Sequence, residues 1–405
     1  MSVTDYTSLL RITCRVARGT TPRLLWKFVR NFGMRNLSNM AAFERRMRRG
    51  ESFYPAFMMI SVTERCNLAC SGCWVTRGGK KSLTPEQLDG IIRQSKAQGS
   101  YFFGILGGEP LLYEGLFEVI EKHPDCYFQL FTNATLITPE VARRMNRLGN
   151  ITPLISIEGL HEESDRRRGR NEVYERTLKG LRACREAKLI FGIAASICRS
   201  NFDELVSRRH LENLAREGAA FMWYYIYRPV GADAHPENAL SKEQIRQLRE
   251  FIVEQRRNAP LIIIDVYWGA DGRAICPAAS GMSHHISPSG YVEFCPPLQM
   301  AMERLNADGS NLAEICRESE FLANLRKLAA ETSRGCILME DPQRLADFLE
   351  AHGGYETTSR GTFLKELRRM RPVPGHDMKD EMIPEKNPIY RMLQKRYFLG
   401  FGAYG

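Results

Sequence analysis

Between residues 57 and 227, short apolar runs typical of strands alternate with longer amphipathic runs typical of helices. The predicted strands are 57–63, 101–106, 126–132, 153–159, 191–197 and 221–227; the predicted helices are 84–98, 114–122, 138–148, 172–187 and 203–217. Strands that alternate with helices at this spacing indicate βαβ units. The pattern therefore predicts an α/β fold with a parallel sheet of six units. Periodicity alone does not decide whether such a sheet closes into a full barrel.

The alternation ends near residue 230, and we divide the chain into five predicted segments. They are a basic amphipathic arm (1–55), the βα core (56–235), a linker helix and strand (236–270), a loop-rich region with three cysteines (271–345), and C-terminal helices with an aromatic tail (346–405). No apolar run has the length that spans a bilayer. The amino-terminal stretch lacks the pattern of a secretion signal.

Eleven cysteines is a high number for a chain of 405 residues, and three of them fall in the stretch ERCNLACSGCWVT at 64–76. An odd count with a tight cluster argues against a disulfide framework, so we expect a reducing, cytoplasmic location. A structural zinc site normally takes four protein ligands, and no fourth Cys or His lies near Cys66, Cys70 and Cys73. Three thiolates on one loop can hold three irons of a [4Fe-4S] cluster and leave the fourth iron open.

The spacing Cys66-x3-Cys70-x2-Cys73, followed by an aromatic residue, resembles the signature of the radical S-adenosylmethionine (SAM) superfamily. Three stretches at predicted strand ends also resemble this family: LGGEP at 106–110, FTNATLI at 131–137 and ISIEGL at 155–160. Ala134 stands where the family usually has Gly, and Glu158 where it usually has Asp. The resemblance covers roughly residues 57–230 and implies a partial (β/α)6 barrel of the TIM type, followed here by a C-terminal α+β extension.

The resemblance implies a [4Fe-4S] cluster held by Cys66, Cys70 and Cys73, with SAM bound at the open iron. The SAM-binding residues that it implies are Trp74, Gly107, Gly108, Glu109, Pro110, Asn133, Ser156 and Arg168. Glu109 would hold the amino group of SAM, and Trp74 would lie near the adenine. The implied reaction is reductive cleavage of SAM to a 5′-deoxyadenosyl radical, which abstracts hydrogen from a substrate. An electron donor such as flavodoxin or ferredoxin is the implied partner.

A second set of cysteines, Cys276, Cys295 and Cys336, lies in the loop-rich region. The stretch SPSGYVEFCPP around Cys295 resembles the auxiliary-cluster domain known as SPASM, or its shorter Twitch form, and implies a second [4Fe-4S] cluster on these three residues. Met339 stands where the last Twitch cysteine would fall. Two interpretations stay open: a cluster with an open or non-cysteine fourth position, or three core thiols without a cluster. His284 and His285 could supply a nitrogen ligand, but we expect ordinary loop histidines.

The basic arm carries most of the net charge of the protein. Residues 1–55 hold eleven Lys or Arg and three Asp or Glu, a balance of +8 out of the total of +10. Leu24, Phe28 and Phe32 recur at helix spacing, with Arg23 and Lys27 among them. A basic amphipathic helix suits an anionic membrane surface. It can equally pack on the barrel of its own chain, and we expect no nucleic-acid partner.

The sequence leaves the substrate open between two hypotheses. One is a peptide or protein side chain, the usual substrate of relatives with a SPASM domain. The other is a lipid or small metabolite at the inner face of the membrane, suggested by the basic arm. A non-catalytic iron–sulfur protein is a remote third alternative. Several acidic and phenolic side chains lie near predicted strand ends without an assigned role: Tyr225, Tyr227, Asp265, Tyr267 and Asp271.

Overall fold

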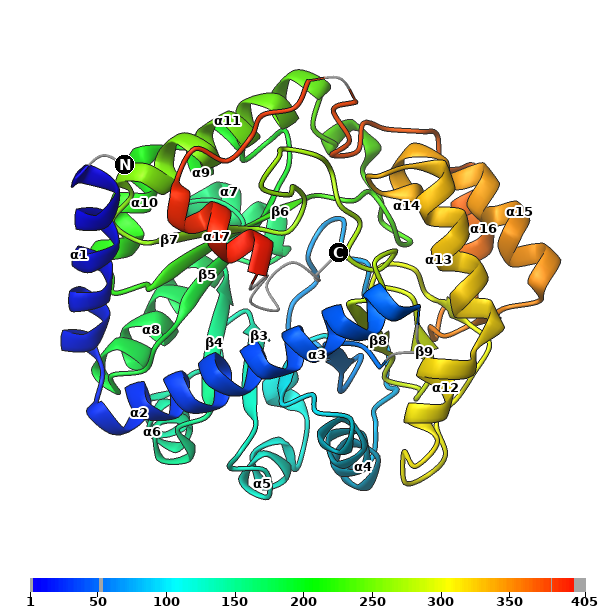
Figure 1. Ribbon diagram of the computed structural model, residues 1–405, viewed down its shortest axis with the longest axis horizontal. Helices are drawn as coiled ribbons and strands as arrows, with labels where there is room; N and C mark the ends of the chain where they lie inside the picture. The colour runs from blue at the N-terminus through cyan, green and yellow to red at the C-terminus, as the bar shows by residue number, and fades with distance from the viewer. Residues whose placement is uncertain (1–2, 51–53, 380, 397–405) are drawn as a thin grey trace.

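A nine-stranded sheet forms the centre of the protein in a computed structural model that describes residues 3–50, 54–379 and 381–396 (Figure 1). Its strands lie in the order β7-β6-β5-β4-β3-β2-β1-β8-β9. Every neighbouring pair from β7 to β8 is parallel, and β9 pairs with β8 in the antiparallel sense. The strands are β1 Phe57–Ser61, β2 Phe102–Leu106, β3 Tyr127–Thr132, β4 Ile151–Ser156, β5 Gly192–Ile197, β6 Phe221–Ile226, β7 Ile262–Asp265, β8 Ser283–Ile286 and β9 Val292–Glu293, with a separate pair, β10 Met300–Ala301 and β11 Tyr355–Glu356.

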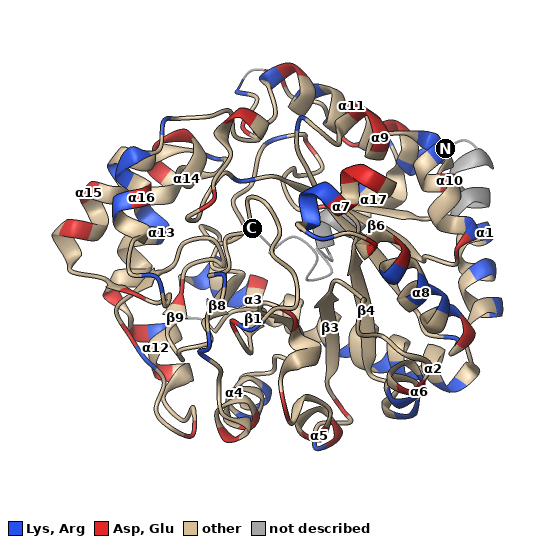
Figure 2. Ribbon diagram, turned by 180° about the vertical axis from the view of Figure 1, so that it is seen from behind, with Lys and Arg blue, Asp and Glu red and all other residues tan. Residues whose placement is uncertain are grey.

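Helices cover the outside of this sheet, and a group of C-terminal helices lies beyond β9 (Figure 1). The helices are α1 Val3–Gly19, α2 Pro22–Lys27, a π-helical stretch Phe28–Met34, α3 Arg35–Arg49, α4 Pro85–Ala97, α5 Leu116–Glu121, α6 Pro139–Leu148, α7 His161–Arg168, α8 Val173–Glu186, α9 Phe202–Leu205, α10 Arg208–Arg216, α11 Lys242–Asn258, α12 Leu312–Glu318, α13 Glu320–Thr332, α14 Ile337–Glu340, α15 Pro342–His352, α16 Phe363–Arg369 and α17 Pro388–Arg396. Charged residues lie mostly on the helices and loops, while the strands are mostly uncharged (Figure 2).

The predicted α/β class and the partial (β/α)6 barrel are confirmed, and the sheet is longer than predicted. The strand placed in the linker, β7, continues the parallel sheet beside β6, and α11 packs against it. On the other side β8, from the predicted extension, pairs with β1. The predicted helix 203–217 is two helices, α9 and α10, and α7 was not predicted. Helix α7 gave no sequence signal because it has no apolar stripe: its buried residues are Ser164 and Arg168.

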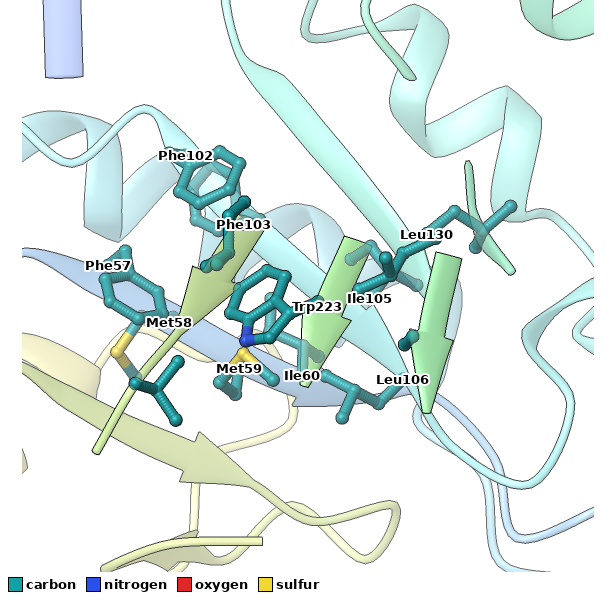
Figure 3. Packing of buried hydrophobic residues seen from close by; sticks show 14 of the residues in the cluster. Phe57, Met58, Met59, Ile60, Phe102, Phe103, Ile105, Leu106, Leu130 and Trp223 are labelled. Carbon is teal, nitrogen blue, oxygen red and sulfur yellow. The ribbon is translucent and has the colours of Figure 1, made fainter. Parts of the chain in front are cut away.

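The core lies between the sheet and the helices and also fills the inside of the curved sheet. Strands β1 and β2 are buried along their whole length, as near-continuous apolar runs in a parallel sheet should be. Figure 3 shows their side chains packed with Leu130 of β3 and Trp223 of β6. The rings of Phe131 and Trp223 lie 6.3 Å apart although two strands separate β3 from β6. Flat neighbouring strands are about 4.8 Å apart, so this contact requires the sheet to curl.

The basic arm, α1 to α3, runs across the amino ends of the strands (Figure 1). From α1 to α3 the arm meets the strands in the reverse of their order along the chain. Arg15 donates to the carbonyl oxygens of Ala219 and Pro260, which precede β6 and β7. Further along, Asn31 donates to the carbonyl oxygens of Pro124 and Cys126 before β3. The ring of Phe32 lies 5.0 Å from that of Phe102 in β2, and Asn39 donates to the carbonyl of Ala56 before β1. The arm therefore closes the amino-terminal face of the barrel.

Part of the positive charge of the arm is used at the carboxyl ends of the outer helices. Lys27 Nζ donates to the Leu148 carbonyl, the last residue of α6, over 2.5 Å. Arg23 donates to the Arg147 carbonyl in the same turn. The carboxyl end of a helix carries partial negative charge, which favours such cations. Of the two alternatives for the arm, packing on the barrel of its own chain is confirmed for its inner face.

A buried ionic network fastens the C-terminal segment to the sheet. Asp265, at the end of β7, lies 3.3 Å from Arg249 Nη1 and 2.7 Å from Arg256 Nη2. Arg256 also pairs with Glu385 at 2.8 Å, and the Tyr390 hydroxyl accepts from the Ile263 amide. Tyr390, one of the predicted tail aromatics, is therefore a packing residue. The other aromatics of the predicted tail, Tyr397, Phe398, Phe401 and Tyr404, lie outside the described residues.

We expect Asp265→Asn to lower the free energy of unfolding by about 3–5 kcal/mol, because it leaves Arg249 and Arg256 as insufficiently compensated buried charges. Urea denaturation measures this change. The matched control is Asp271→Asn, whose carboxylate is exposed and pairs with Arg273 at 3.6 Å. That surface change should stay within about 0.5 kcal/mol of the parent. Equal stability of the two variants would contradict the role given to the buried network.

Candidate active site

A cavity of about 290 Å³ opens at the carboxyl ends of the strands, the edge opposite the arm. Barrel-type folds place their chemistry at this edge. The walls come from the ends of β1 to β6 and the loops after them. The predicted site residues that line the cavity are Cys66, Cys70, Cys73, Trp74, Gly107, Gly108, Asn133, Ser156 and Arg168. Residues from five parts of the sequence, predicted from the resemblance, are thus brought to one cavity.

The cysteine loop follows β1 and is held by contacts with neighbouring loops. Gly72 has φ +70°, and a Cβ there would lie 2.3 Å from the Tyr227 hydroxyl, so only glycine fits between the cysteines and this ring. Arg77 donates to the Cys70 carbonyl over 2.9 Å and to the Asp233 carboxylate over 2.6 Å. The loop that carries the three thiols is therefore tied to the segment after β6.

Gly107 and Gly108 allow the loop after β2 to lie directly against the cysteine loop. Gly107 has φ +148°, and a Cβ on it would lie 2.5 Å from the Thr63 carbonyl oxygen. A Cβ on Gly108 would lie 2.3 Å from the Arg65 carbonyl oxygen. The Gly108 amide donates to Thr63 O over 2.7 Å, and the next amide donates to Arg65 O over 2.8 Å. Close backbone approach is therefore the physical reason for the glycine pair.

Glu109 is fully buried behind the cavity wall and, like Pro110, is not among the residues that line the cavity. Its carboxylate accepts from the Asn133 amide and from the Thr132 hydroxyl, each over 2.8 Å, and from the Leu111 amide over 3.2 Å. Burial raises the pKa of this carboxyl. In this arrangement Glu109 fixes the end of β3, and its predicted contact with an amino group stays a prediction.

Arg168 brings a positive charge to the three thiols. Its Nη1 lies 3.6 Å from the sulfur of Cys70, and its Nη2 donates to the Ser156 carbonyl over 2.8 Å. Glu158 holds it from the other side at 3.9 Å and also lies 3.4 Å from Arg167. A guanidinium next to a thiol favours the thiolate, which is the form that binds metal.

The thiols of the first set suit an iron–sulfur cluster. Cys66 is exposed to the cavity, whereas Cys70 and Cys73 are half-buried in its wall. Desolvation raises the pKa of Cys66 to about 11 and that of Cys73 to about 12, with the neighbouring thiols adding to the effect. A metal centre removes the proton from a coordinating thiol, so Cys66 and Cys73 would lose their protons on binding a cluster. Three sulfurs beside one cation and an open cavity fit a cluster with three protein ligands.

Trp74, directly after the last of these cysteines, is held by the C-terminal part of the chain. Its carbonyl accepts from Gln299 Nε2 over 3.1 Å and from Arg360 Nη1 over 3.4 Å. Its ring stands edge-on to that of His285, 6.1 Å away. His285 in turn bonds to Ser61 over 2.8 Å and to the buried Glu293. The predicted adenine-side residue therefore rests on a polar network that includes β8.

The second set of cysteines is also brought together in space. Cys276, Cys295 and Cys336 come from three separate loops, and each lies near enough to another to influence it electrostatically. Burial raises the pKa of Cys276 to about 11 and raises that of Cys295 well above its ordinary value. The Arg228 guanidinium donates to Cys336 Sγ over 3.4 Å.

The nearby histidines are not placed as ligands of this set. His285 uses both ring nitrogens on Ser61 and Glu293, and His284 Nε2 lies 3.2 Å from Arg326. Both belong to β8 and are buried, so the expectation of loop histidines is wrong about their place in the fold. Met339 is buried in α14.

Several cavity residues have no role assigned by the sequence analysis. Arg167 donates to the Ser196 carbonyl over 2.8 Å and lies over the Tyr227 ring. Arg228 and Tyr225 line the wall at the end of β6. Their position at the end of a predicted strand could have marked them as site residues. An isolated arginine or tyrosine there matches no motif, so there was no reason in the sequence to assign them a role. Of the unassigned candidates, Asp265 is in the ionic network and Asp271 is exposed.

Residues 60–205 match the sequence model of the Radical SAM superfamily. They form a radical SAM domain. The mycofactocin maturase MftC of Mycolicibacterium smegmatis is 26% identical over 260 residues, which cover 60% of this chain and 64% of that protein. An AdoMet-dependent heme synthase of Methanosarcina barkeri is 28% identical over 214 residues, which cover 50% of this chain and 60% of that protein. The chain thus spans less than two thirds of the length of these curated relatives.

Among solved structures, SuiB of Streptococcus suis bound to S-adenosylmethionine superposes with a TM-score of 0.61 at 17% identity, over 72% of each chain. The same protein has been solved with its precursor peptide SuiA, and that structure superposes with a TM-score of 0.58. This likeness confirms the fold of the radical SAM domain. No helix in the described parts of the chain is long and apolar enough to cross a membrane.

We expect Cys66 and Cys73 in metal-free protein to react slowly with iodoacetamide at pH 8, because the thiolate is the nucleophile and both pKa values are raised. For a pKa of about 11 the thiolate fraction at pH 8 is about a hundredfold below that of an unperturbed thiol. The rate should rise about tenfold per pH unit up to about pH 10. Mass spectrometry of the two cysteine peptides measures this, with the same peptides in urea-unfolded protein as reference. Equal rates in folded and unfolded protein at pH 8 would refute the raised pKa values.

Proposed function

We propose that this protein is a radical SAM enzyme that abstracts hydrogen from a peptide or protein side chain. The observation that carries the proposal is the meeting of Cys66, Cys70 and Cys73 with Arg168 in one cavity at the carboxyl edge of the sheet. When bound there, a [4Fe-4S] cluster and SAM supply reductive cleavage of SAM and the hydrogen-abstracting radical. An electron donor such as flavodoxin or ferredoxin belongs to the same proposal.

The roles that we propose for the chain follow from its contacts. The three thiolates hold the cluster, and Arg168 balances their charge through Cys70. Gly107 and Gly108 bring backbone groups to the cavity wall, where the polar part of SAM can approach closely. Trp74 offers a flat apolar surface to the adenine. Glu109, behind the wall, acts by fixing the end of β3, from which Asn133 reaches the cavity.

A second [4Fe-4S] cluster on Cys276, Cys295 and Cys336 forms part of this proposal. Its support is the convergence of three distant cysteines beside the buried side of the cavity wall, with Arg228 as a cation at one sulfur. The region 271–345 would then be a SPASM- or Twitch-like domain. Met339, which stands where the last Twitch cysteine would fall, is buried in α14, so this cluster would have an open or non-cysteine fourth position.

A peptide substrate is the choice that relatives support best. MftC is named as a maturase, and the SuiB structure contains a precursor peptide. A small metabolite is the second candidate, because an AdoMet-dependent heme synthase matches half of this chain. Mass spectrometry of the products after incubation with a candidate peptide or an iron porphyrin separates the two, because only the true substrate gives a product of changed mass.

The basic arm no longer supports a lipid substrate. The arm lies across the amino ends of the strands, whereas the cavity opens at their carboxyl ends. A membrane bound by the arm would therefore face away from the cavity. Membrane contact itself stays a prediction, because Leu10, Trp26 and Val29 on the outer side of the arm are 62%, 59% and 43% exposed. Liposome flotation of the full chain and of a Trp26→Ala variant tests it.

We expect anaerobically reconstituted protein, reduced with dithionite, to convert SAM into 5′-deoxyadenosine, which chromatography with mass spectrometry measures. Changing Cys66, Cys70 and Cys73 together to Ala should abolish the product. It should also lower the iron content from about eight to about four atoms per chain if both clusters form, since each holds four irons. The control is Cys14→Ala, which removes an exposed thiol of α1.

Two results would contradict the proposed function. One is a loaded wild-type protein that yields no 5′-deoxyadenosine. The other is unchanged product formation in the triple variant, because the three thiols would then have no part in SAM cleavage.

A further inference from the structure

Arg228 lies between the two sets of cysteines. It follows β6 at the carboxyl edge of the sheet and lines the main cavity together with Pro296 and Pro297, which come directly after Cys295. On its other side its Nε donates to Cys336 Sγ over 3.4 Å, and its guanidinium carbon lies 5.4 Å from the centre of the Tyr267 ring. One side chain thus forms part of the wall of the SAM cavity and contacts the second set of thiols.

Four other arginines of low exposure in the described residues have a carboxylate partner. Arg168 lies 3.9 Å from Glu158; Arg249 and Arg256 share Asp265; Arg360 lies 2.8 Å from Glu366. For Arg228, in the described parts of the chain, no carboxylate lies within ion-pair distance, and the guanidinium contacts the Cys336 sulfur and the Tyr267 ring. A guanidinium keeps its charge at any ordinary pH, so enclosing it without an anion is costly. Ionised thiolates of the second set would supply that anion.

We propose that Arg228 is a positioning residue of the second iron–sulfur centre, where its charge and its N–H···S bond raise the reduction potential of that centre. The inference rests on the second cluster of the proposed function. On one-electron reduction the centre gains one negative charge and no bond to the protein forms or breaks. A nearby positive charge and a hydrogen bond to a ligand sulfur both stabilise the reduced form more than the oxidised form.

The location of Arg228 gives this proposal a functional meaning. The centre would lie just behind the wall of the cavity in which the substrate reacts, at the stretch Cys295–Pro296–Pro297. Abstraction of a hydrogen atom leaves a substrate radical, and loss of one electron and one proton from it gives a closed-shell product. A centre beside the cavity with a raised potential is a suitable acceptor for that electron, with the proton released to solvent.

The test is a redox titration followed by EPR, in the background where Cys66, Cys70 and Cys73 are all Ala. In that background the second centre is the source of the iron–sulfur signal. We expect Arg228→Gln to shift the one-electron equilibrium at least tenfold toward the oxidised form, which is about 59 mV. Arg228→Lys keeps the charge and should shift it less. Arg304→Gln removes an exposed arginine that donates to the Ser289 carbonyl, and should leave the midpoint unchanged.

Each outcome decides for or against the proposal. A midpoint that is unchanged in Arg228→Gln overturns it and assigns the side chain to the SAM cavity instead. Absence of any second-centre signal or iron in the triple-Ala background also overturns it. Loss of second-centre iron in Arg228→Gln with retention in Arg228→Lys supports it. Formation of 5′-deoxyadenosine by the chain with Cys66, Cys70 and Cys73 intact, measured in parallel, reports separately on the proposed function.

Discussion

The common direction of eight neighbouring strands is the constraint on which the rest of this structure depends. Because the strands from β7 to β8 are all parallel, each of these eight ends at one edge of the sheet and begins at the other. The two edges therefore differ in what covers them. At the amino edge the arm covers strand starts with apolar side chains and donates hydrogen bonds to loop carbonyls. At the carboxyl edge the strand ends are left to line a cavity.

The cysteine loop is the point at which distant parts of the chain meet. The glycine pair after β2 binds its backbone on one side, and the segment after β6 holds it through Arg77. The C-terminal region holds the third side. Lys81 Nζ donates to the carbonyl of Thr358 over 3.0 Å, and the Ser359 amide donates to Glu64 over 3.1 Å. A loop fixed on three sides holds its thiols in place before any metal binds, which lowers the ordering cost of binding. The C-terminal extension is therefore part of the support of the first site.

The sequence predicted what repeats or what has a motif, and missed what depends on contacts across the fold. Six strands and the residues at their ends follow from alternation and from short motifs. Strand β8 was not predicted, because its polar sequence SHHI gives no strand signal. Its histidines can be buried because they bond to Glu293 and Arg326, which come later in the chain. Glu109 was placed at the right loop, but which way its carboxylate turns depends on the amide of Asn133. Arg228 has no motif at all.

The arm illustrates why composition alone does not assign a partner. A balance of +8 on 55 residues suggests an anionic surface, yet Arg15, Arg23 and Lys27 donate to carbonyls at the carboxyl ends of the outer helices. A row of such helix ends is a negative surface made by the backbone, and it is invisible in a count of charged side chains. The amino edge of any parallel α/β sheet presents this row, because each helix ends where the next strand begins. A basic arm is therefore as well suited to its own barrel as to a membrane.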